Sequence, residues 1–457
     1  MKALSVIDYL FLFLENHKQP MHIAGLCLFE VPSHADDGFI PKLIDDFKKH
    51  QKATFPFNHK LHKRFFWKAD EQFDLNHHFR HVKLAPNSTL DTLLDYISQQ
   101  HGQGIAKDKP LWEFHLIDNI CPADDSSCPR FAIWLKIHHS LADGVASMRL
   151  LERSLSTRSD CDFSLPFWAI FPKKRQHIDE ILPNKKPLTT LLIQQARTIY
   201  PVAKELTMAL AEHFKPNSPF VSTFDAPKSI LNQRITSNRH LSVASFDKSR
   251  FTDTAKALSV TTNDLLLAVC SGALRQYLMG QNALPNKPLI AFVPISLRRD
   301  DSSTGNQLSF LLTNLGTHLD QAYARLSTIK DSIDDGKRRF SRLTPAQVIN
   351  YSIVAYGWAG LNLATRALPT RQAFNLIISN VPADDAPLYL HGAKLTGIYP
   401  ASVLFDGQAM NITLANHQDK IDFGVTACGS VLPNIGQFLN LVADELTVFE
   451  SIAKSLS

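Results

Sequence analysis

Short apolar runs and helix-like repeats alternate through the first 160 residues. Residues 23–29 and 131–139 are apolar runs with the length of buried strands. Apolar residues spaced three and four positions apart predict helices at residues 89–100 and 143–155. This alternation indicates a layered domain built from both strands and helices.

The rest of the chain repeats this mixture after a change of composition. Residues 171–187 are basic and interrupted by proline, which is typical of a linker, and residues 188–213 then form a long amphipathic helix pattern despite Pro201. Beyond residue 220 we expect helices at 251–258, 263–279, 320–340, 345–366 and 435–456. Strands are expected at 288–297, 308–315, 374–381, 388–398 and 409–427. We therefore predict an N-terminal α/β domain (1–170), a linker with an amphipathic helix (171–219) and a C-terminal α/β domain (220–457).

The composition is that of a globular protein, and the 457 residues allow two or three domains. Hydrophobic residues make up 44% and charged residues 20%, which excludes disordered, collagen-like and coiled-coil chains. The formal charge of +5 fits an anionic ligand or a membrane surface but is too small to indicate nucleic-acid binding. The sequence has no signal-peptide pattern and no uncharged apolar stretch of about 18 residues, so we expect a cytoplasmic protein whose membrane contact is peripheral.

Candidate chemistry lies in residues 138–144, His-His-Ser-Leu-Ala-Asp-Gly, directly after the second apolar run. Because side chains alternate along a strand, His139 continues a wholly apolar row, whereas His138 shares a face with Lys136. Apolar surroundings keep an imidazole neutral, and a neutral imidazole can accept a proton as a general base. Asp143 is placed to cap the helix that follows, and Gly144 allows close approach at the turn.

Two simpler explanations compete with catalysis. A lone histidine on an apolar face is usually a core residue with satisfied hydrogen bonds. A metal site is disfavoured, because adjacent strand residues point apart and His138 and His139 are poorly placed to share one ion. The cysteines form no CxxC pair either, so we predict no metal. The Asp-Gly pair at a fixed offset favours a catalytic histidine over both explanations.

Further segments extend this pattern along nearly the whole chain. They are Asp-Tyr-Leu-Phe-Leu-Phe-Leu-Glu at 8–15, Gln-Pro-Met-His at 19–22, Phe-Asp-Leu-Asn-His-His-Phe-Arg at 73–80, Pro-Leu-Trp at 110–112, Asn-Asp at 263–264, Val-Pro-Ile-Ser-Leu-Arg at 293–298, Ser-Asn-Val-Pro at 379–382 and Gly-Ala-Lys-Leu at 392–395. The histidine segment resembles the superfamily that includes chloramphenicol acetyltransferase and peptide-synthetase condensation domains. The full set, in this order and spacing, resembles the bacterial wax ester synthase/diacylglycerol acyltransferase family.

The resemblance implies a fold and an activity. The fold would be α/β, with two chloramphenicol acetyltransferase-like domains, mixed sheets flanked by helices, and the active site in a channel at their interface. The activity would be transfer of a fatty acyl group from acyl-CoA to a long-chain alcohol, with diacylglycerol as a second acceptor that gives triacylglycerol. Acyl-CoA is a substrate, so no cofactor is expected. The implied partners are a peripheral membrane or lipid-droplet surface and no nucleic acid.

The resemblance also assigns roles to residues. His139 would be the general base that deprotonates the alcohol, with His138 supporting it. No covalent acyl-enzyme is required, because the thioester is already activated and positioning plus deprotonation suffices. Asp143 would be structural, and we predict that it pairs with Arg298 across the domain boundary, since a buried carboxylate needs a partner. The alternative is that Asp143 only caps its helix.

Other residues are assigned to support or to the substrate channel. Asn263 would orient His139 or hold the oxyanion, and its alternative is a helix N-cap. Asn380 would be a supporting polar contact, and its alternative is a turn residue before Pro382. Gly144 and Arg298 complete the supporting set. The expected channel residues, whose simpler explanation is core or close helix packing, are Pro110, Leu111, Trp112, Gly357 and Gly360.

The chain departs from the family's sequence pattern at one place, and two alternative functions stay open. The family usually has Gly-Pro after Asn-Val-Pro, where this chain has Ala383 and Asp384, so a loop near the site is expected to differ. A condensation-type small-molecule acyltransferase and a non-catalytic lipid-binding or lipid-droplet scaffold are the alternative functions. The basic linker and the helix at 188–213 are either a membrane-surface element or an ordinary interdomain helix.

Overall fold

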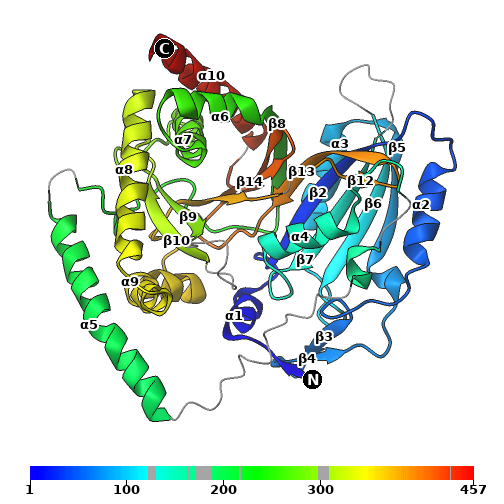
Figure 1. The fold of residues 1–457 in the computed structure, drawn as a ribbon, viewed down its shortest axis with the longest axis horizontal. Helices are drawn as coiled ribbons and strands as arrows, with labels where there is room; N and C mark the ends of the chain where they lie inside the picture. The colour runs from blue at the N-terminus through cyan, green and yellow to red at the C-terminus, as the bar shows by residue number, and fades with distance from the viewer. Residues whose placement is uncertain are drawn as a thin grey trace.

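Two six-stranded sheets form the framework of the molecule, and helices pack against each of them (Figure 1). The computed structural model describes residues 1–121, 130–161, 165–170, 188–215, 218–296, 308–383, 385–432 and 434–456. Both sheets combine parallel and antiparallel pairs, so the expected α/β class with mixed sheets is confirmed.

The first sheet carries the histidine segment at the end of a central strand. Its order is β12 (Tyr389–Leu390), β13 (Ala393–Ala401), β2 (His22–Glu30), β7 (Arg130–His138), β6 (Trp112–Ile120) and β5 (Phe79–Ser88). Neighbours are antiparallel except for β5 and β6. Helices α2 (Phe39–Lys48) and α4 (Gly144–Ser154) cover one face, and α3 (Leu90–Gly102) covers the other. Each face of the sheet is therefore buried under helices.

The second sheet has a parallel centre and antiparallel edges. Its order is β10 (Leu308–Asn314), β9 (Ile290–Ser296), β11 (Leu376–Val381), β14 (Met410–His417), β15 (Lys420–Cys428) and β8 (Arg239–Asp247). One face contributes to a large apolar core with α6 (Lys248–Ala257), α7 (Thr262–Gly280), α8 (Ala322–Ser341) and α10 (Phe438–Leu456). Helix α9 (Pro345–Thr365) packs against the other face at the β9–β10 edge.

Strands β12 and β13 cross from the second half of the chain into the first sheet. Strand β13 pairs with β2, which places Ile398 opposite Cys27 (Figure 1). It also passes close to β15, where a Cβ on Gly424 would collide with the carbonyl oxygen of Pro400. The two sheets are thus joined through β13, a crossover that the predicted division at 1–170 and 220–457 does not contain.

The remaining elements lie around this framework. A small sheet has the order β1 (Lys2–Ala3), β4 (Phe66–Ala69) and β3 (His59–His62). Helix α1 (Val6–Leu14) lies near it, and short 3₁₀ turns occur at Leu75–His77, Phe167–Ala169 and Ile435–Gln437. Helix α5 (Leu188–His213) packs Val202 into the large core, and Glu205 pairs with Arg339 on α8. Ile199, Tyr200 and Leu210 of α5 are exposed.

Most predicted elements are confirmed within a few residues. The expected strand at 388–398 is divided into β12 and β13, and the one at 409–427 is the hairpin of β14 and β15. Helices α1 and α2 and strands β1, β3, β4, β5, β6 and β8 were not predicted. The linker at 171–187 lies outside the described residues. Among the described helices, none is long and apolar enough by itself to cross a membrane; α6 and α7 reach that length and apolarity only as a pair bent by 103°.

Candidate active site

Strand β7 delivers His139 to the space between the two sheets. The predicted alternation is confirmed, because Phe131, Ile133, Leu135 and Ile137 pack in one apolar cluster while Ala132 and Trp134 pack in another. His139 follows the last strand residue on the first of these faces, and its backbone N–H donates to the carbonyl oxygen of Met21 at 2.8 Å. The backbone of β2 therefore fixes the point at which the imidazole leaves the strand.

The His139 side chain is half-buried in an apolar setting. The ring of Phe11 on α1 stacks on the imidazole, with centroids 4.1 Å apart and an interplanar angle of 18°. Burial lowers the pKa of His139 below its ordinary 6.5, although the negative charges of Asp143 and Asp8 act in the opposite direction. The neutral imidazole, which is the form that a general base requires, is thereby favoured near pH 7.

His138 faces away from this space and is buried, 1% exposed, among protein partners. Its Nδ1 lies 2.7 Å from the Ser140 hydroxyl and accepts the Ser140 N–H at 3.2 Å. Its Nε2 lies 3.6 Å from Oε1 of Glu15, whose other oxygen pairs with Lys107 at 2.6 Å. Burial alone would raise the pKa of Glu15, but the hydrogen bonds and charges of His138 and Lys107 bring it to about 2. His138 thus ties the end of β7 to the end of α1.

Asp143 begins helix α4. Its side chain accepts the Ala146 N–H at 2.7 Å, which is an N-cap, so the expected capping role is confirmed. The predicted pairing with Arg298 falls outside the described residues. Gly144, the first residue of α4, lines a cavity beside His139, and a Cβ there would lie 3.8 Å from Val381. The turn between β7 and α4 is therefore held by a cap and positioned at the cavity wall.

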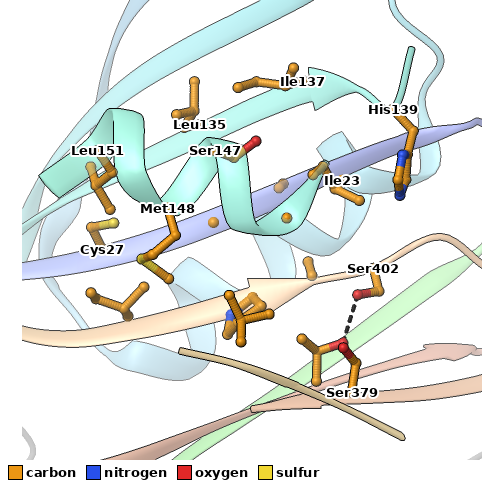
Figure 2. Close-up of a pocket in the computed structure, with 18 residues that line it drawn as sticks. Ile23, Cys27, Leu135, Ile137, His139, Ser147, Met148, Leu151, Ser379 and Ser402 are labelled. Carbon is orange, nitrogen blue, oxygen red and sulfur yellow. Dashed lines mark hydrogen bonds between the residues drawn. The ribbon is translucent and has the colours of Figure 1, made fainter. Parts of the chain in front are cut away.

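Two apolar cavities meet at His139. The smaller, of about 160 Å³, lies between β2, β7, β13 and α4, and Figure 2 shows the His139 ring at one end of it. The larger, of about 420 Å³, lies between α1, α9 and the β9–β10 edge of the second sheet. The residues that line both cavities are Ile23, His139, Ser379 and Ser402. The His139 imidazole therefore lies where two elongated ligands, one in each cavity, would meet.

The predicted channel residues divide into two groups. Gly360 on α9 lines the larger cavity, whereas Gly357 lies on the same helix and lines neither cavity. A Cβ would meet nothing within 4 Å at either glycine, so close helix packing does not explain them. Gly360 therefore lies in a cavity wall, as expected for a channel residue, whereas Gly357 lies in the wall of neither cavity.

The Pro110-Leu111-Trp112 segment does not line either of these two cavities, so the expectation that it shapes the channel gains no support from them and stays a prediction. Leu111 and Trp112 are fully buried, and the Trp112 indole N–H donates to the carbonyl oxygen of Phe57 at 2.8 Å. The Leu111 carbonyl oxygen accepts the His138 N–H at 3.0 Å. The segment therefore supports the end of β7 from the core, which is the packing role that composition alone suggested.

The two predicted asparagines also lie outside the cavity walls. Thr261, not Asn263, is the N-cap of α7, where it forms a capping box with Asp264, so the N-cap alternative for Asn263 is wrong. Asn380 lies within β11 and accepts a hydrogen bond from the Asn416 amide at 3.2 Å, so the turn alternative for Asn380 is wrong. Asn380 alternates with Ser379 and Val381, which do line the smaller cavity.

Sequence reasoning assigned no role to Phe11, Ser379 or Ser402, although all three line the cavities. Phe11 and Ser379 belong to segments that carried the family resemblance, so a signal existed for these two. Ser402 has no such signal, because it reaches the site through the crossover of β13. Its hydroxyl, from which the dashed line in Figure 2 starts, lies 2.7 Å from the Thr413 hydroxyl. The Thr413 hydroxyl donates to Asn411 at 2.9 Å. These hydroxyls form the polar part of an otherwise apolar junction.

Comparison with known proteins covers most of the chain. Residues 4–266 match the wax ester synthase/diacylglycerol acyltransferase catalytic domain, and residues 304–450 match the C-terminal domain of the same family. The chain is 45% identical over 454 residues to the O-acyltransferase WSD of Acinetobacter baylyi, which covers 99% of this chain and 98% of the relative. It is 35% identical over 449 residues to the Mycobacterium tuberculosis protein named "Probable diacyglycerol O-acyltransferase tgs2", covering 94% of this chain and 95% of the relative.

Solved structures give the same result for the fold. The wax ester synthase/diacylglycerol acyltransferase from Marinobacter aquaeolei matches with a TM-score of 0.78 and 33% identity, covering 99% of this chain and 100% of the other. A condensation domain of the calcium-dependent antibiotic synthetase matches with a TM-score of 0.58 at 13% identity, over 99% and 96%, and shows the fold alone. The expected two-domain chloramphenicol acetyltransferase-like fold is confirmed. On both family models and on these relatives, the chain belongs to the wax ester synthase/diacylglycerol acyltransferase family.

Proposed function

We propose that this acyltransferase moves a fatty acyl group from acyl-CoA to the hydroxyl of a long-chain alcohol, and also to diacylglycerol, with His139 as the general base. The observation that carries the proposal is the position of His139 at the junction of two apolar cavities. A thioester and an alcohol, each with an alkyl chain, need two apolar spaces that meet at one base. Family membership supports the reaction type.

The reaction needs only one proton carrier. The neutral His139 imidazole takes the hydroxyl proton as the alcohol oxygen attacks the thioester carbonyl carbon. The tetrahedral intermediate then collapses, its carbon–sulfur bond breaks, and the imidazolium returns the proton to the departing CoA thiolate. The hydroxyls of Ser379 and Ser402 are our candidates for hydrogen bonding to the oxyanion, because both line the two cavities beside His139. Asn263, Arg298 and Asn380 keep the supporting roles that the family resemblance implies.

A lipid surface is the proposed place of action, because the alcohol and diacylglycerol substrates are poorly soluble in water. This part is supported by exposed apolar side chains on α1 and α5. The enzyme would act from the surface of a membrane or lipid inclusion.

The test is an assay of the purified chain with acyl-CoA and a panel of alcohols and diacylglycerol. We expect wax ester from hexadecanol and triacylglycerol from diacylglycerol, both detected with CoA release. Absence of ester from every acceptor would leave the lipid-scaffold alternative in place. A condensation-type enzyme would instead prefer small polar acceptors over long-chain alcohols.

The larger cavity can be tested separately through α9. A Leu side chain at Gly360 would fill part of this cavity, so Gly360→Leu should reduce the rate with the longest chains about 10-fold relative to short ones. Gly357→Leu is the matched control, since Gly357 lies on the same helix and lines neither cavity. Equal chain-length profiles for both variants would contradict the assignment of this cavity to an alkyl chain.

A further inference from the structure

Helix α1 presents apolar side chains to solvent although it is one of the most hydrophobic segments of the chain. Tyr9, Leu10 and Phe13 are exposed, and Phe13 has 60% of its surface accessible. Their spacing puts them on one side of the helix. The start of the helix is fixed by a capping box in which Ser5 and Asp8 each accept the other's backbone N–H at 3.1 Å. A well-anchored helix with an uncovered apolar side is typical of a contact surface.

The turn between β3 and β4 extends this surface. Phe65 is 55% exposed, Phe66 is also exposed, and the Phe65 ring stacks on Tyr9 with centroids 5.6 Å apart. The Phe65 carbonyl oxygen accepts the Leu4 N–H at 3.0 Å, which holds the turn against the segment before α1. We call the combined surface the docking face, and its members are Tyr9, Leu10, Phe13, Phe65 and Phe66.

Positive charge borders the docking face. Lys63 and Arg64 immediately precede Phe65, are exposed, and have left-handed backbone conformations with φ of 48° and 62° that form the turn. Asp8 is engaged in the capping box, and Glu71 pairs with Lys68 at 3.2 Å. Two cations beside exposed aromatic rings match the interface of an anionic lipid surface, where phosphate groups lie next to acyl chains.

The opposite side of α1 reaches the candidate active site. Phe11 stacks on His139 and lines the larger cavity, and Leu14 is buried against Met21. The docking face and the candidate base are therefore separated by the thickness of one helix, about 10 Å. A lipid surface that binds this face would lie beside the cavity in which an alkyl acceptor has to enter.

We propose that the docking face binds the surface of a bilayer that contains anionic lipid, and that α1 thereby couples lipid contact to the His139 site. The inference rests on the proposed function and adds the surface that it uses. A second copy of this chain is a poorer occupant, because a symmetric contact would bring Lys63 and Arg64 of both copies together. The proposal places lipid contact at α1 and the β3–β4 turn.

The experiment measures binding of the full chain to vesicles of phosphatidylcholine with phosphatidylglycerol. Phe13→Asp with Phe65→Asp should reduce the bound fraction at least about 10-fold, because two large apolar side chains are lost and two negative charges added. The matched control is Tyr323→Asp on α8, an aromatic side chain that is 54% exposed on a helix distant from α1 (Figure 1). It should bind like the wild type, and thermal unfolding checks that each variant is folded.

A second double variant tests the contribution of the positive charges beside the docking face. Lys63→Glu with Arg64→Glu should weaken binding to the anionic vesicles but not to vesicles of phosphatidylcholine alone. Wild-type binding to anionic vesicles should decrease as salt is raised. Wild-type vesicle binding that is absent, or that both double variants retain, would overturn the proposal. So would a wild-type dimer that the Phe13→Asp, Phe65→Asp variant dissociates, because the face would then be an interface between copies.

Activity separates this inference from the proposed function. The ratio of the rate with vesicle-borne hexadecanol to the rate with the soluble pair hexanoyl-CoA and butanol should fall about 10-fold in the Phe13→Asp, Phe65→Asp variant. An unchanged ratio would overturn the docking face while leaving the acyltransferase activity intact. Absence of turnover with both pairs in the wild type would instead remove the proposed function, whatever the vesicle binding.

Discussion

The two faces of strand β7 contrast sharply at its end, where two consecutive histidines have opposite surroundings. His139 belongs to the apolar face, contacts the Phe11 ring and lines both cavities. His138 belongs to the other face and is buried between Ser140 and Glu15. The sequence neighbours therefore differ in what they can do, since one is open to a substrate and the other is occupied by protein partners.

The face of His138 also carries a buried charge network. Lys136 is fully buried, and its ammonium group lies 3.3 Å from the Glu113 carboxylate and donates to the Gln100 carbonyl oxygen at 3.0 Å. Burial alone would raise the pKa of Glu113, but the hydrogen bond with His115 and the charges of Lys136 and Arg80 bring it to about 2. Charges that are buried and paired in this way are expensive to disturb.

The comparison suggests a division of labour across one strand. Buried ion pairs on the polar face stabilise the position of β7. Burial on the apolar face favours the neutral form of the His139 imidazole. A base that must act with little reorganisation benefits from such support, because its position is fixed before substrate arrives. Substitutions on the two faces should therefore separate rate from stability.

The largest expected effect is on the apolar face. His139→Ala removes the proposed base, so kcat for ester formation from acyl-CoA and hexadecanol should fall about 100- to 10,000-fold. The melting temperature should change less than in the charge-pair variants below, because the half-buried ring is not a member of any buried ion pair among the described residues. Steady-state kinetics and thermal unfolding of the same preparation measure both quantities. Full activity in His139→Ala would exclude the base mechanism.

On the polar face the largest effect should be on stability. Lys136→Met leaves the Glu113 carboxylate without its nearest buried cation, and we expect the free energy of unfolding to fall by about 3 kcal/mol. The lower end of the usual range applies because Arg80 and His115 still face Glu113. Denaturant unfolding measures the change.

A double variant shows whether the loss reflects the unpaired charge. Lys136→Met combined with Glu113→Leu removes both members of the pair, so most of the lost stability should return. Additive losses in the double variant would mean that packing of the lysine chain, and not its charge, stabilises this face.

Much of this contrast could be predicted from the sequence. The period-two alternation of strand residues separates His139 from His138, and the cap at Asp143 follows from its position before a helical pattern. These features depend on local geometry, which a short stretch of residues determines. For the same reason most helices and strands were predicted close to their observed bounds.

The rest depends on contacts between distant parts of the chain. Strand β13 joins β2 across more than 300 positions, and no local pattern specifies which sheet it enters. Ser402 reaches the cavities through this crossover. Phe11 contacts His139 because α1 packs next to the point where the two cavities meet. The sequence also could not decide between core packing and a channel role for Trp112, because a buried aromatic residue has the same sequence signal in a core as in a channel wall.

His138 should show a smaller effect than Lys136. His138→Ala removes one partner of the buried Glu15 carboxylate, which keeps its ion pair with Lys107, and leaves the Ser140 N–H without its side-chain acceptor, so the free energy of unfolding should fall by about 1–3 kcal/mol. The decrease in kcat should be smaller than in His139→Ala. His138→Asn is the control, because it keeps an acceptor close to the position of Nδ1 and should retain part of the stability. A loss of activity equal to that of His139→Ala, with unchanged stability, would place His138 in the chemistry.

The smallest expected effect is a shift of the pH–rate profile. The neutral imidazole is the base, so kcat/KM should fall as pH decreases through the pKa of His139. Burial disfavours the imidazolium, so the midpoint of this acid limb should lie below the ordinary 6.5. Phe11→Ala exposes the ring to water and should move the midpoint upward toward 6.5, whereas Tyr323→Asp should leave it in place. A wild-type midpoint above 6.5 would mean that the charges of Asp143 and Asp8 outweigh burial, and the apolar face would then not be what keeps His139 neutral.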